Sequence, residues 1–552
     1  MHGSSITKSE IALETGIKIS SFVSGLIFLV FCNPTSALSP EEELEKMSLD
    51  QKVGQLMIWS YSGTDFTSNL KRTLVRYRPG ALIAFRRNIK SPSQIAQFNL
   101  AIQKFARTQL KYPLFLMVDQ EGGVVTRIRT GTPLPSALAL GRIKDVRLLE
   151  SFARTTGEFL FGLGFNVNLA PVLDISNPTR DSFIGSRAFG DDPILVAQQA
   201  TAYSRGLHSG GVIPTAKHFP GHGGIIQDSH KEIPSKTSTL DELKKKDLVP
   251  FEDFTSASFP RAVMMAHLAL PELDASGLPA TYSSVIVQDC LRSTLKYSGL
   301  VITDDLEMNG ASVSEDIGER AILAFLAGND MLMLAGPPKN QRRAFRAIRE
   351  AVNSGRISME RLNESVLRIL NTKSKLKPPQ TTYDHRRTLT TIKKLNMMSV
   401  QIIKANYKAA LNAVTKPWPE VSPQTQAVVF SASWLFFKRF QNRFQGRARF
   451  YHLDPDTLAG AQQTLADPRT DVAIFFATGA KTARWLNRLP YDLREKTIVV
   501  NANHMGAIDE QDSFLSVLNV NTYATAVGSL LADSLNTPSK LRTPSSTSDA
   551  SD

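Results

Sequence analysis

The sequence contains little cysteine and no long apolar run. Only Cys32 and Cys290 occur in 552 residues, which excludes a fold held together by a disulfide framework. No segment has the ~18 continuous apolar residues that an ordinary membrane-spanning helix needs. Glycine and proline, at 33 and 29 residues, are close to average usage, so a collagen-like or wholly disordered chain is also excluded.

The chain has an excess of positive charge. It carries 64 Lys and Arg against 51 Asp and Glu, a net charge of +13. Such a charge balance is typical of proteins that bind nucleic acid, an anionic membrane surface or an acidic polymer. No nucleic-acid-binding module or aromatic platform accompanies it, which disfavours nucleic acid. Residues 371–395 hold seven basic residues and one acidic residue, so much of the excess is a local surface property, suited to loose association with an anionic envelope.

Residues 1–37 are predicted to be an export leader. Lys8 and Lys18 precede a short apolar stretch at 21–31, and the small residues of 35–37 follow it. A basic start, a short apolar stretch and a small-residue site are typical of a secretory signal peptide. Cleavage after Ala37 would leave Cys290 as the one cysteine of the mature chain, and lipidation at Cys32 or retention of the leader are the alternatives. We therefore expect an exported protein, periplasmic or associated with the cell envelope.

Strand-like and helix-like segments alternate from residue 53 to 335. Strands alternating with helices predict parallel pairing, because each return crossover needs a helix. Eight such units in about 300 residues predict a (β/α)8 TIM-type barrel over 40–370. A doubly wound open sheet is the alternative, but no Gly-rich dinucleotide fingerprint opens any unit. The predicted strands are Val53–Trp59, Ala81–Phe85, Leu114–Val118, Val167–Leu169, Val212–Ala216, Ala262–Ala266, Leu300–Thr303 and Met331–Leu334.

Composition changes after the barrel. Residues 371–395 are polar and basic and contain a Pro-Pro pair, which predicts an interdomain linker. Five further strand-like runs with helical stretches between them predict a smaller C-terminal α/β sandwich domain over 396–535. Residues 536–552 are rich in Ser, Thr, Pro and Asp and predict a disordered tail.

Polar residues follow five of the eight barrel strands. In a barrel of this type the active site lies at the carboxyl ends of the strands. The segments are 119–123 (Asp-Gln-Glu-Gly-Gly), 170–174 with 186–187, 217–223 (Lys-His-Phe-Pro-Gly-His-Gly) with 228–230 (Asp-Ser-His), His267, and 304–308 (Asp-Asp-Leu-Glu-Met). Their convergence on one rim predicts an active site.

Two carboxylates and one histidine stand out among these residues. Asp304 ends an apolar strand, where its carboxylate can attack or stabilise a cation, although either Asp304 or Asp305 can instead cap the following helix. Asp228 and His230 lie two residues apart and can face each other across a tight turn. A carboxylate beside an imidazole makes an acid/base pair, and an ordinary surface Asx turn is the alternative.

Two other interpretations of segment 217–223 are disfavoured. His218 and His222 have the spacing of a helical zinc site, but Phe-Pro-Gly between them prevents the helix that would bring them together. Lys217 at a strand end could form a Schiff base, yet that chemistry needs a desolvated amine and His218 lies beside this one. No metal and no cofactor are predicted.

These motifs resemble those of the glycoside hydrolase family 3 β-N-acetylglucosaminidases. The resemblance rests on residues 119–123, 217–223, 228–230 and 303–308, in the family's order and spacing. It is strong over 40–370 and weak over 396–535. It implies retaining hydrolysis of terminal, non-reducing β-linked N-acetylglucosamine, with peptidoglycan fragments or related amino-sugar glycans as substrates.

The resemblance also implies roles for individual residues. Asp304 matches the nucleophile, His230 the acid/base and Asp228 its partner, so a His–Asp dyad replaces the second carboxylate of the usual two-carboxylate scheme. The positions that match the sugar-binding residues are Asp119, Arg127, Arg187, Lys217 and His218. Val124 stands where the family usually has Arg, which changes the local salt-bridge pattern.

Two other functions remain open on the sequence. A β-glucosidase or β-xylosidase of the same family is disfavoured by the Asp-Ser-His segment. A glycan-binding envelope protein without catalysis would be expected to lack Asp304, His230 or Lys217, and all three are present.

Overall fold

The computed structural model describes residues 38–176, 184–225, 227–229, 231–412, 421–431, 434–452 and parts of 461–536. The predicted leader (1–37), His230 and residues 537–552 of the predicted tail lie outside the described residues. Among the described residues, no helix combines the length and the apolar character that crossing a membrane requires.

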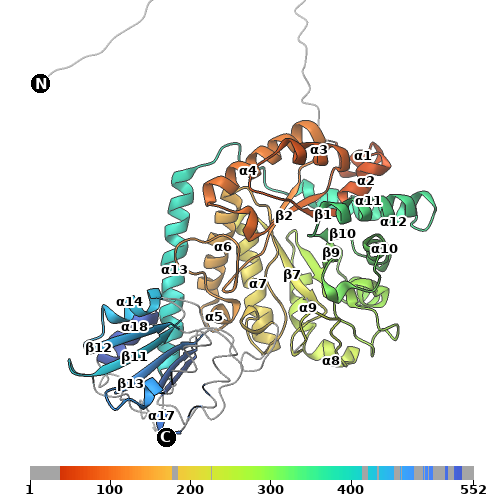
Figure 1. Cartoon of the computed structure of the whole chain (residues 1–552). Coiled ribbons are helices and arrows are strands. Elements are labelled where there is room, and N and C mark those ends of the chain that lie inside the picture. The colour runs from red at the N-terminus through yellow and green to blue at the C-terminus, as the bar shows by residue number, and fades with distance from the viewer. Residues whose placement is uncertain are drawn as a thin grey trace, which may run out of the picture. The chain divides into compact units, whose positions relative to one another are not determined.

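Eight parallel strands close into a barrel, which confirms the predicted fold class (Figure 1). Around the barrel the strand order is β1-β10-β9-β8-β7-β6-β3-β2, and the ring closes where Met57 of β1 pairs with Leu332 of β10. The strands are β1 (Met57–Ser60), β2 (Ala81–Ala84), β3 (Phe115–Val118), β6 (Val167–Asn168), β7 (Ile213–Phe219), β8 (Ala262–Met265), β9 (Leu300–Asp305) and β10 (Met331–Leu334).

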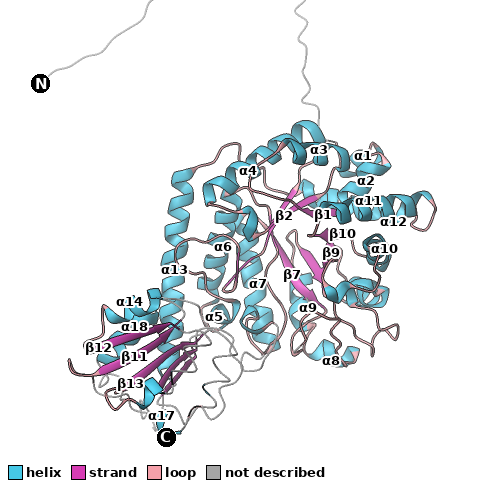
Figure 2. Cartoon of the chain, viewed as in Figure 1, coloured by secondary structure: helices cyan, strands magenta, loops and turns pink. Residues whose placement is uncertain are grey.

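Helices follow the strands and surround the barrel (Figure 2). Their sequences carry recognisable start signals: Ser91, Asp145, Asp192 and Asp316 each cap a helix by accepting a backbone N–H in its first turn. The main helices of the barrel are α2 (Leu49–Gln55), α3 (Ser68–Tyr77), α4 (Pro92–Phe105), α6 (Val146–Gly162), α7 (Pro193–Gly210), α8 (Leu240–Lys245), α9 (Val249–Thr255), α10 (Ile317–Ala327), α11 (Pro338–Asn353) and α12 (Met359–Ser374).

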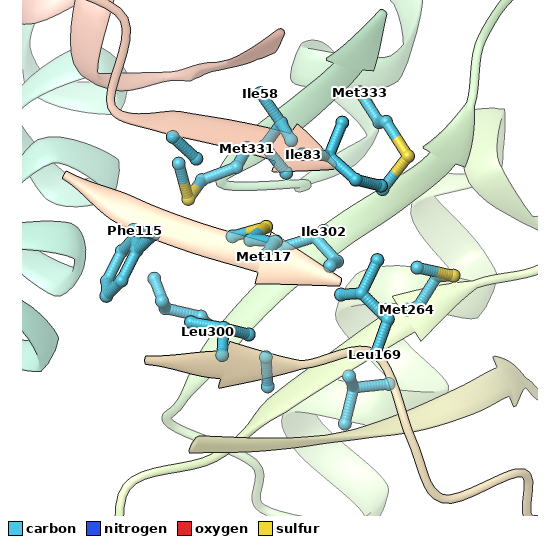
Figure 3. Packing of buried hydrophobic residues seen from close by; sticks show 14 of the residues in the cluster. Ile58, Ile83, Phe115, Met117, Leu169, Met264, Leu300, Ile302, Met331 and Met333 are labelled. Carbon is cyan, nitrogen blue, oxygen red and sulfur yellow. The ribbon is translucent and has the colours of Figure 1, made fainter. Parts of the chain in front are cut away.

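Large apolar side chains fill the barrel (Figure 3). They recur at every second position of a strand, as in Phe115 and Met117, or Met331 and Met333, because alternate residues of a strand point to the same face. The interior is therefore a packed core, and ligands have access only at its ends.

Three predicted strand boundaries are wrong by two residues or more. The first strand begins at Met57, not at Val53, because residues 53–55 form the last turn of α2 and are buried as helix. The strand predicted over 212–216 extends to Phe219, and the one predicted to stop at Thr303 extends to Asp305. Lys217, His218 and Asp304 are thus strand residues, which holds their backbones in the barrel wall.

The predicted linker contains regular structure. Helix α13 begins at His385 and runs to Asn412, so the last part of segment 371–395 is helical. Its basic residues occupy the exposed face, while Leu395 and Ile402 pack into the barrel core and Ile403 and Tyr407 into a second core. Part of the polar composition that predicted a linker is therefore the exposed face of α13, while the Pro-Pro pair at 378–379 lies in the segment between α12 and α13.

The C-terminal region forms a second α/β layer structure. Five parallel strands have the order β12-β11-β13-β14-β15, namely β12 (Arg447–His452), β11 (Gln426–Ser431), β13 (Val472–Ala477), β14 (Thr497–Asn501) and β15 (Ser516–Asn519). Alternate residues pack on opposite faces: Val429 and Ile474 join the core with α13, α14 (Trp434–Gln441) and α18 (Val527–Asn536), whereas Phe430 and Phe475 join another. A sheet buried on both faces confirms the predicted α/β sandwich.

Candidate active site

The segment after β3 turns back on itself to bring two charged residues together. β4 (Gln120–Gly122) and β5 (Val125–Thr126) pair antiparallel, with Gly122 and Gly123 at positive φ of 96° and 55°. A Cβ on Gly122 would lie 2.1 Å from the carbonyl oxygen of Pro135, so the turn requires glycine there. The reversal places Arg127 Nη2 3.4 Å from Asp119 Oδ2.

Val124 is the residue at the tip of this hairpin, and its side chain is 59% exposed. The Asp119–Arg127 ion pair forms without an arginine at that position. Val124 in place of arginine therefore leaves an apolar side chain exposed beside the ion pair.

Lys217 links two acidic residues of that segment. Its Nζ lies 2.9 Å from Asp119 Oδ1 and 2.7 Å from Glu121 Oε1. Arg187 donates to Glu121 through Nε and Nη2, each at 2.9 Å, in a bidentate pair. Four of the five predicted sugar-binding residues thus meet through Glu121 and Asp119.

Burial and charge act in opposite directions in this network. Burial alone would raise the pKa of Glu121, but the Arg187 and Lys217 charges and their hydrogen bonds hold it well below its ordinary value. Burial would lower the pKa of Lys217, but Glu121 and Asp119 raise it. Glu121, Arg187 and Lys217 are therefore ionised at neutral pH, and the buried amine of Lys217 is a cation rather than a nucleophile. This charge state disfavours Schiff-base chemistry.

His218 is oriented by a buried carboxylate. Its Nδ1 lies 2.6 Å from Oδ2 of Asp174, and the backbone N–H groups of His218 and His222 donate to Oδ1 at 3.2 and 2.7 Å. Since a carboxylate only accepts hydrogen bonds, Nδ1 carries a proton and Nε2 faces Arg187 Nη2 at 3.4 Å. Burial opposes ionisation of Asp174, but the His218 hydrogen bond and charge lower its pKa overall.

His218 and His222, which have the spacing of a helical zinc site, do not share a helix. His218 lies in β7 and His222 after it, with ring centroids 6.2 Å apart. Among the described residues, no group of three or more His, Cys, Asp or Glu side chains could hold a metal ion.

The two adjacent aspartates at the end of β9 have different environments. Asp305 Oδ1 accepts from the backbone N–H groups of Ala335 at 3.0 Å and Glu307 at 3.2 Å, so this carboxylate ties β9 to β10. Burial raises the pKa of Asp305 to about 6. Burial acts in the same direction on Asp304, but His267, His218, the Asp305 N–H and Lys217 together hold the pKa of Asp304 below its usual range. Asp304 is thus the more readily ionised of the pair.

His267 is a rim residue that the sequence motifs did not assign to the site. Its Nε2 lies 3.0 Å from the carbonyl oxygen of Asp305, and its Nδ1 lies 2.9 Å from Thr281 Oγ1. It therefore holds the backbone directly after Asp304. Its place at the end of β8 was visible in the sequence, but a lone histidine carries no motif.

Glu121 and Asp174 are further residues missing from the predicted set. Glu121 lies inside the recognised segment 119–123, and Asp174 lies in the loop after β6. Both are buried acceptors whose partners come from distant strands, a relation that spacing along the chain does not reveal.

The loop after β7 lies against the loop after β9. Gly310 N donates to the carbonyl oxygen of Ser229 at 2.8 Å, while the carbonyl oxygen of Asp228 accepts from the N–H groups of Lys231 and Glu232 at 2.8 and 3.2 Å. Asp228, in the loop after β7, and Asp304, in the last part of β9, therefore lie at one rim of the barrel. His230 lies outside the described residues, so its pairing with Asp228 stays a prediction.

Comparisons with known proteins agree with this geometry. The family model described as glycosyl hydrolase family 3 N-terminal domain matches residues 48–372. A β-hexosaminidase from Idiomarina loihiensis is 33% identical over 331 residues, which are 57% of this chain and 97% of the relative. A β-hexosaminidase from Pseudomonas aeruginosa is 37% identical over 300 residues, 53% of this chain and 86% of the relative.

Two solved structures match this chain over different lengths. A family 3 β-N-acetylglucosaminidase from Paenibacillus superposes with a TM-score of 0.76 at 27% identity, covering 89% of this chain and 97% of that one. LpqI from M. tuberculosis, with a TM-score of 0.57 at 29% identity, covers 62% of this chain and 98% of its own. The barrel, its rim of ionised side chains and these matches establish that the chain belongs to glycosyl hydrolase family 3 and is a glycoside hydrolase.

Proposed function

We propose that this protein is a retaining exo-β-N-acetylglucosaminidase. Asp304 carries the proposal: it ends β9, keeps its pKa below the usual range, and leaves its neighbour Asp305 to bind backbone N–H groups. An ionised carboxylate at that position can attack the anomeric carbon and form a glycosyl–Asp304 intermediate. Relatives that match most of their own length are named β-hexosaminidases, which supports an amino-sugar substrate.

The ionised network next to Asp304 suits a terminal sugar. Asp119 can accept from two hydroxyl groups, while Arg127, Arg187 and Lys217 supply donors from three sides. Because these side chains already pair with one another, they are held in place before a ligand arrives. We assign to them the hydroxyl groups at the non-reducing end, which makes the enzyme exo-acting.

Proton transfer is assigned to His230 with Asp228 as its partner. His230 would protonate the leaving oxygen in the first step and then activate the water that releases the sugar from Asp304. Asp228 would stabilise the imidazolium that forms. The carbonyl groups of Asp228 and Ser229 accept backbone hydrogen bonds, which supports a defined position for the segment.

Peptidoglycan fragments or related amino-sugar glycans are the proposed substrates, and the cell envelope or periplasm the proposed location. Residues 1–37 support export through their leader pattern. Assay of a β-1,4-linked N-acetylglucosaminyl–N-acetylmuramic acid disaccharide beside chitobiose tests the substrate. If N-acetylglucosamine is released from neither of these two substrates, the proposed substrate class is contradicted.

The nucleophile is tested by Asp304→Asn against the matched variant Asp305→Asn. We expect Asp304→Asn to lose at least about 10³-fold in kcat on 4-nitrophenyl N-acetyl-β-glucosaminide, since a nucleophilic carboxylate has no substitute. Asp305→Asn keeps an oxygen that accepts hydrogen bonds and should keep most activity. Near-wild-type turnover by Asp304→Asn would refute the assignment.

The acid/base role is tested by His230→Ala with two classes of substrate. Poor leaving groups need protonation and should suffer the larger loss, whereas 2,4-dinitrophenolate leaves unaided. Equal losses on both classes contradict the role of His230. Preferential hydrolysis of 4-nitrophenyl β-glucoside would favour the β-glucosidase alternative.

A further inference from the structure

Helix α13 carries a stripe of positive charge that the catalytic site does not use. Over His385–Asn412 the sequence contains no acidic residue. Its exposed cations are Arg386, Arg387, Lys393, Lys394, Lys404 and Lys408. None of the six forms an ion pair within 4.0 Å with any residue that the structure describes.

Five of these cations face one direction. At 3.6 residues per turn, Arg386, Lys393, Lys394, Lys404 and Lys408 fall within an arc of about 100° and span about 33 Å along the helix. Arg387 is set apart because it shares a small recess with Glu158 and Asp384, whose charges oppose its own. The remaining five define the cationic stripe.

The opposite side of α13 fixes this stripe rigidly on the molecule. Leu395 and Ile402 are buried in the barrel core, and α13 lies beside α6 (Figure 1). Asn396 Nδ2 donates to the carbonyl oxygen of Thr130 at 2.8 Å, and Asn406 Nδ2 to that of Ala139 at 2.9 Å. The helix backbone therefore needs no ordering when the stripe meets a partner.

An apolar side chain lies in the middle of the stripe. Met397 falls within the same arc and is 72% exposed, the most exposed of the large apolar side chains that the structure describes. An unbranched thioether gains little from a soluble polyanion in water. At a bilayer it can enter the headgroup region while the lysine stems extend and their ammonium groups stay among lipid phosphates.

We propose that the cationic stripe of α13 is a peripheral binding surface for a bilayer of anionic phospholipid. This deepens the envelope location proposed above and does not depend on the glycosidase activity. Each cation near an anionic bilayer contributes roughly 1 kcal/mol, about fivefold in affinity. Five cations together give weak, reversible and salt-sensitive binding.

Vesicle co-sedimentation of the full chain tests the proposal. The vesicles are phosphatidylcholine alone, or phosphatidylcholine with about one third phosphatidylglycerol. Comparison of the two removes any contribution from the apolar stretch at 21–31, because that contribution does not require lipid charge. We expect preferential binding to the anionic vesicles, which is lost as salt rises to about 0.5 M.

The decisive variant is Lys393→Gln, Lys394→Gln, Lys404→Gln and Lys408→Gln combined. It should lose at least about tenfold in affinity for the anionic vesicles. A control with the same net charge replaces four exposed, dispersed lysines by Gln, namely Lys90, Lys104, Lys245 and Lys339. The control should retain most of the binding.

Met397→Ser removes no charge and should still weaken vesicle binding. Hydrolysis of the chromogenic substrate by every variant is measured in parallel, so loss of binding is separated from loss of the fold or of the proposed activity. Unchanged binding by the fourfold variant overturns the proposal, and so does an equal loss in the control. If the protein binds heparin tightly and does not bind anionic vesicles, the proposal of a bilayer is overturned and the partner is a soluble polyanion.

Discussion

Gly310 is the position where a single methyl group should disturb catalysis without touching a catalytic residue. It lies in the short helical turn Asn309–Ala311 after β9. A Cβ there would meet the carbonyl oxygen of Ser229 at 2.6 Å, that of Glu232 at 3.2 Å and the Cβ of His267 at 3.2 Å. Gly310→Ala therefore pushes the loop that follows Asp304 away from the loop that carries Asp228.

The displacement can be worked out from these contacts. An ordinary van der Waals contact begins at 3.4 Å, so the Ser229 carbonyl must move by about 0.8 Å from 2.6 Å. The hydrogen bond from Gly310 N, now 2.8 Å, holds the same carbonyl and must lengthen or rotate. Asp228 is next in the chain and moves with it. A misplacement of about 1 Å in a reacting geometry costs up to ~10²-fold in rate.

The expected result is a 10- to 100-fold fall in kcat for substrates with poor leaving groups, and a smaller fall for the 2,4-dinitrophenyl glycoside. Azide should partly restore turnover of the activated substrate, because a small anion attacks the glycosyl intermediate without a general base. A purely structural defect would lower kcat on both substrates alike, and azide would not restore it.

The matched control is Gly162→Ala. Gly162 ends α6, and a Cβ there would have no heavy atom within 4 Å. Wild-type kinetics are expected for this variant. Gly310→Ala with unchanged kinetics on both substrates would refute the inference that the Ser229–Gly310 contact positions the acid/base loop.

Two further predictions concern buried charges. Glu121→Gln replaces the carboxylate shared by Arg187 and Lys217 with a neutral amide, so it should raise KM and lower the free energy of unfolding by about 3 kcal/mol, as measured in urea titrations. Lys373 is buried, donates to Gln55 Oε1 at 2.7 Å, and has its pKa lowered by burial to about 7, against 10.5 when unfolded. Between those values the unfolded chain binds more protons, so the stability of the wild type relative to Lys373→Met should rise with pH, by up to about 1.4 kcal/mol per pH unit.

Exposed residues of the same type provide the controls for both predictions. Glu360→Gln removes one negative charge from the surface of α12 and should leave KM and stability unchanged. Lys375→Met replaces an exposed lysine, and its stability relative to the wild type should not vary between pH 7 and 10. If the difference in stability between the wild type and Lys373→Met does not change with pH, Lys373 stays charged when it is buried.

The local pattern of the sequence was sufficient to predict the architecture. Short apolar runs such as Met331–Leu334, each followed by a helical stretch, are properties of a few consecutive residues, and parallel pairing follows from the crossovers. The same holds for Lys217 and Asp304, which adjoin apolar strands and so had to reach the rim. The pattern could not separate the end of α2 from the start of β1, since buried helix and buried strand are both continuously apolar there.

By itself the sequence determined the barrel, the α/β sandwich after it, and the segments that reach the rim, because these depend on local periodicity and chain order. Only the tertiary structure decided that Glu121 joins Arg187 to Lys217, that Asp174 orients His218, and that Asp305 accepts the backbone N–H groups of Glu307 and Ala335. The tertiary structure also decided that residues 385–395 of the basic segment belong to α13, with their cations on its exposed face. Each of these relations joins residues on different strands or helices, and its energy depends on burial and distance, which exist only once the chain has folded.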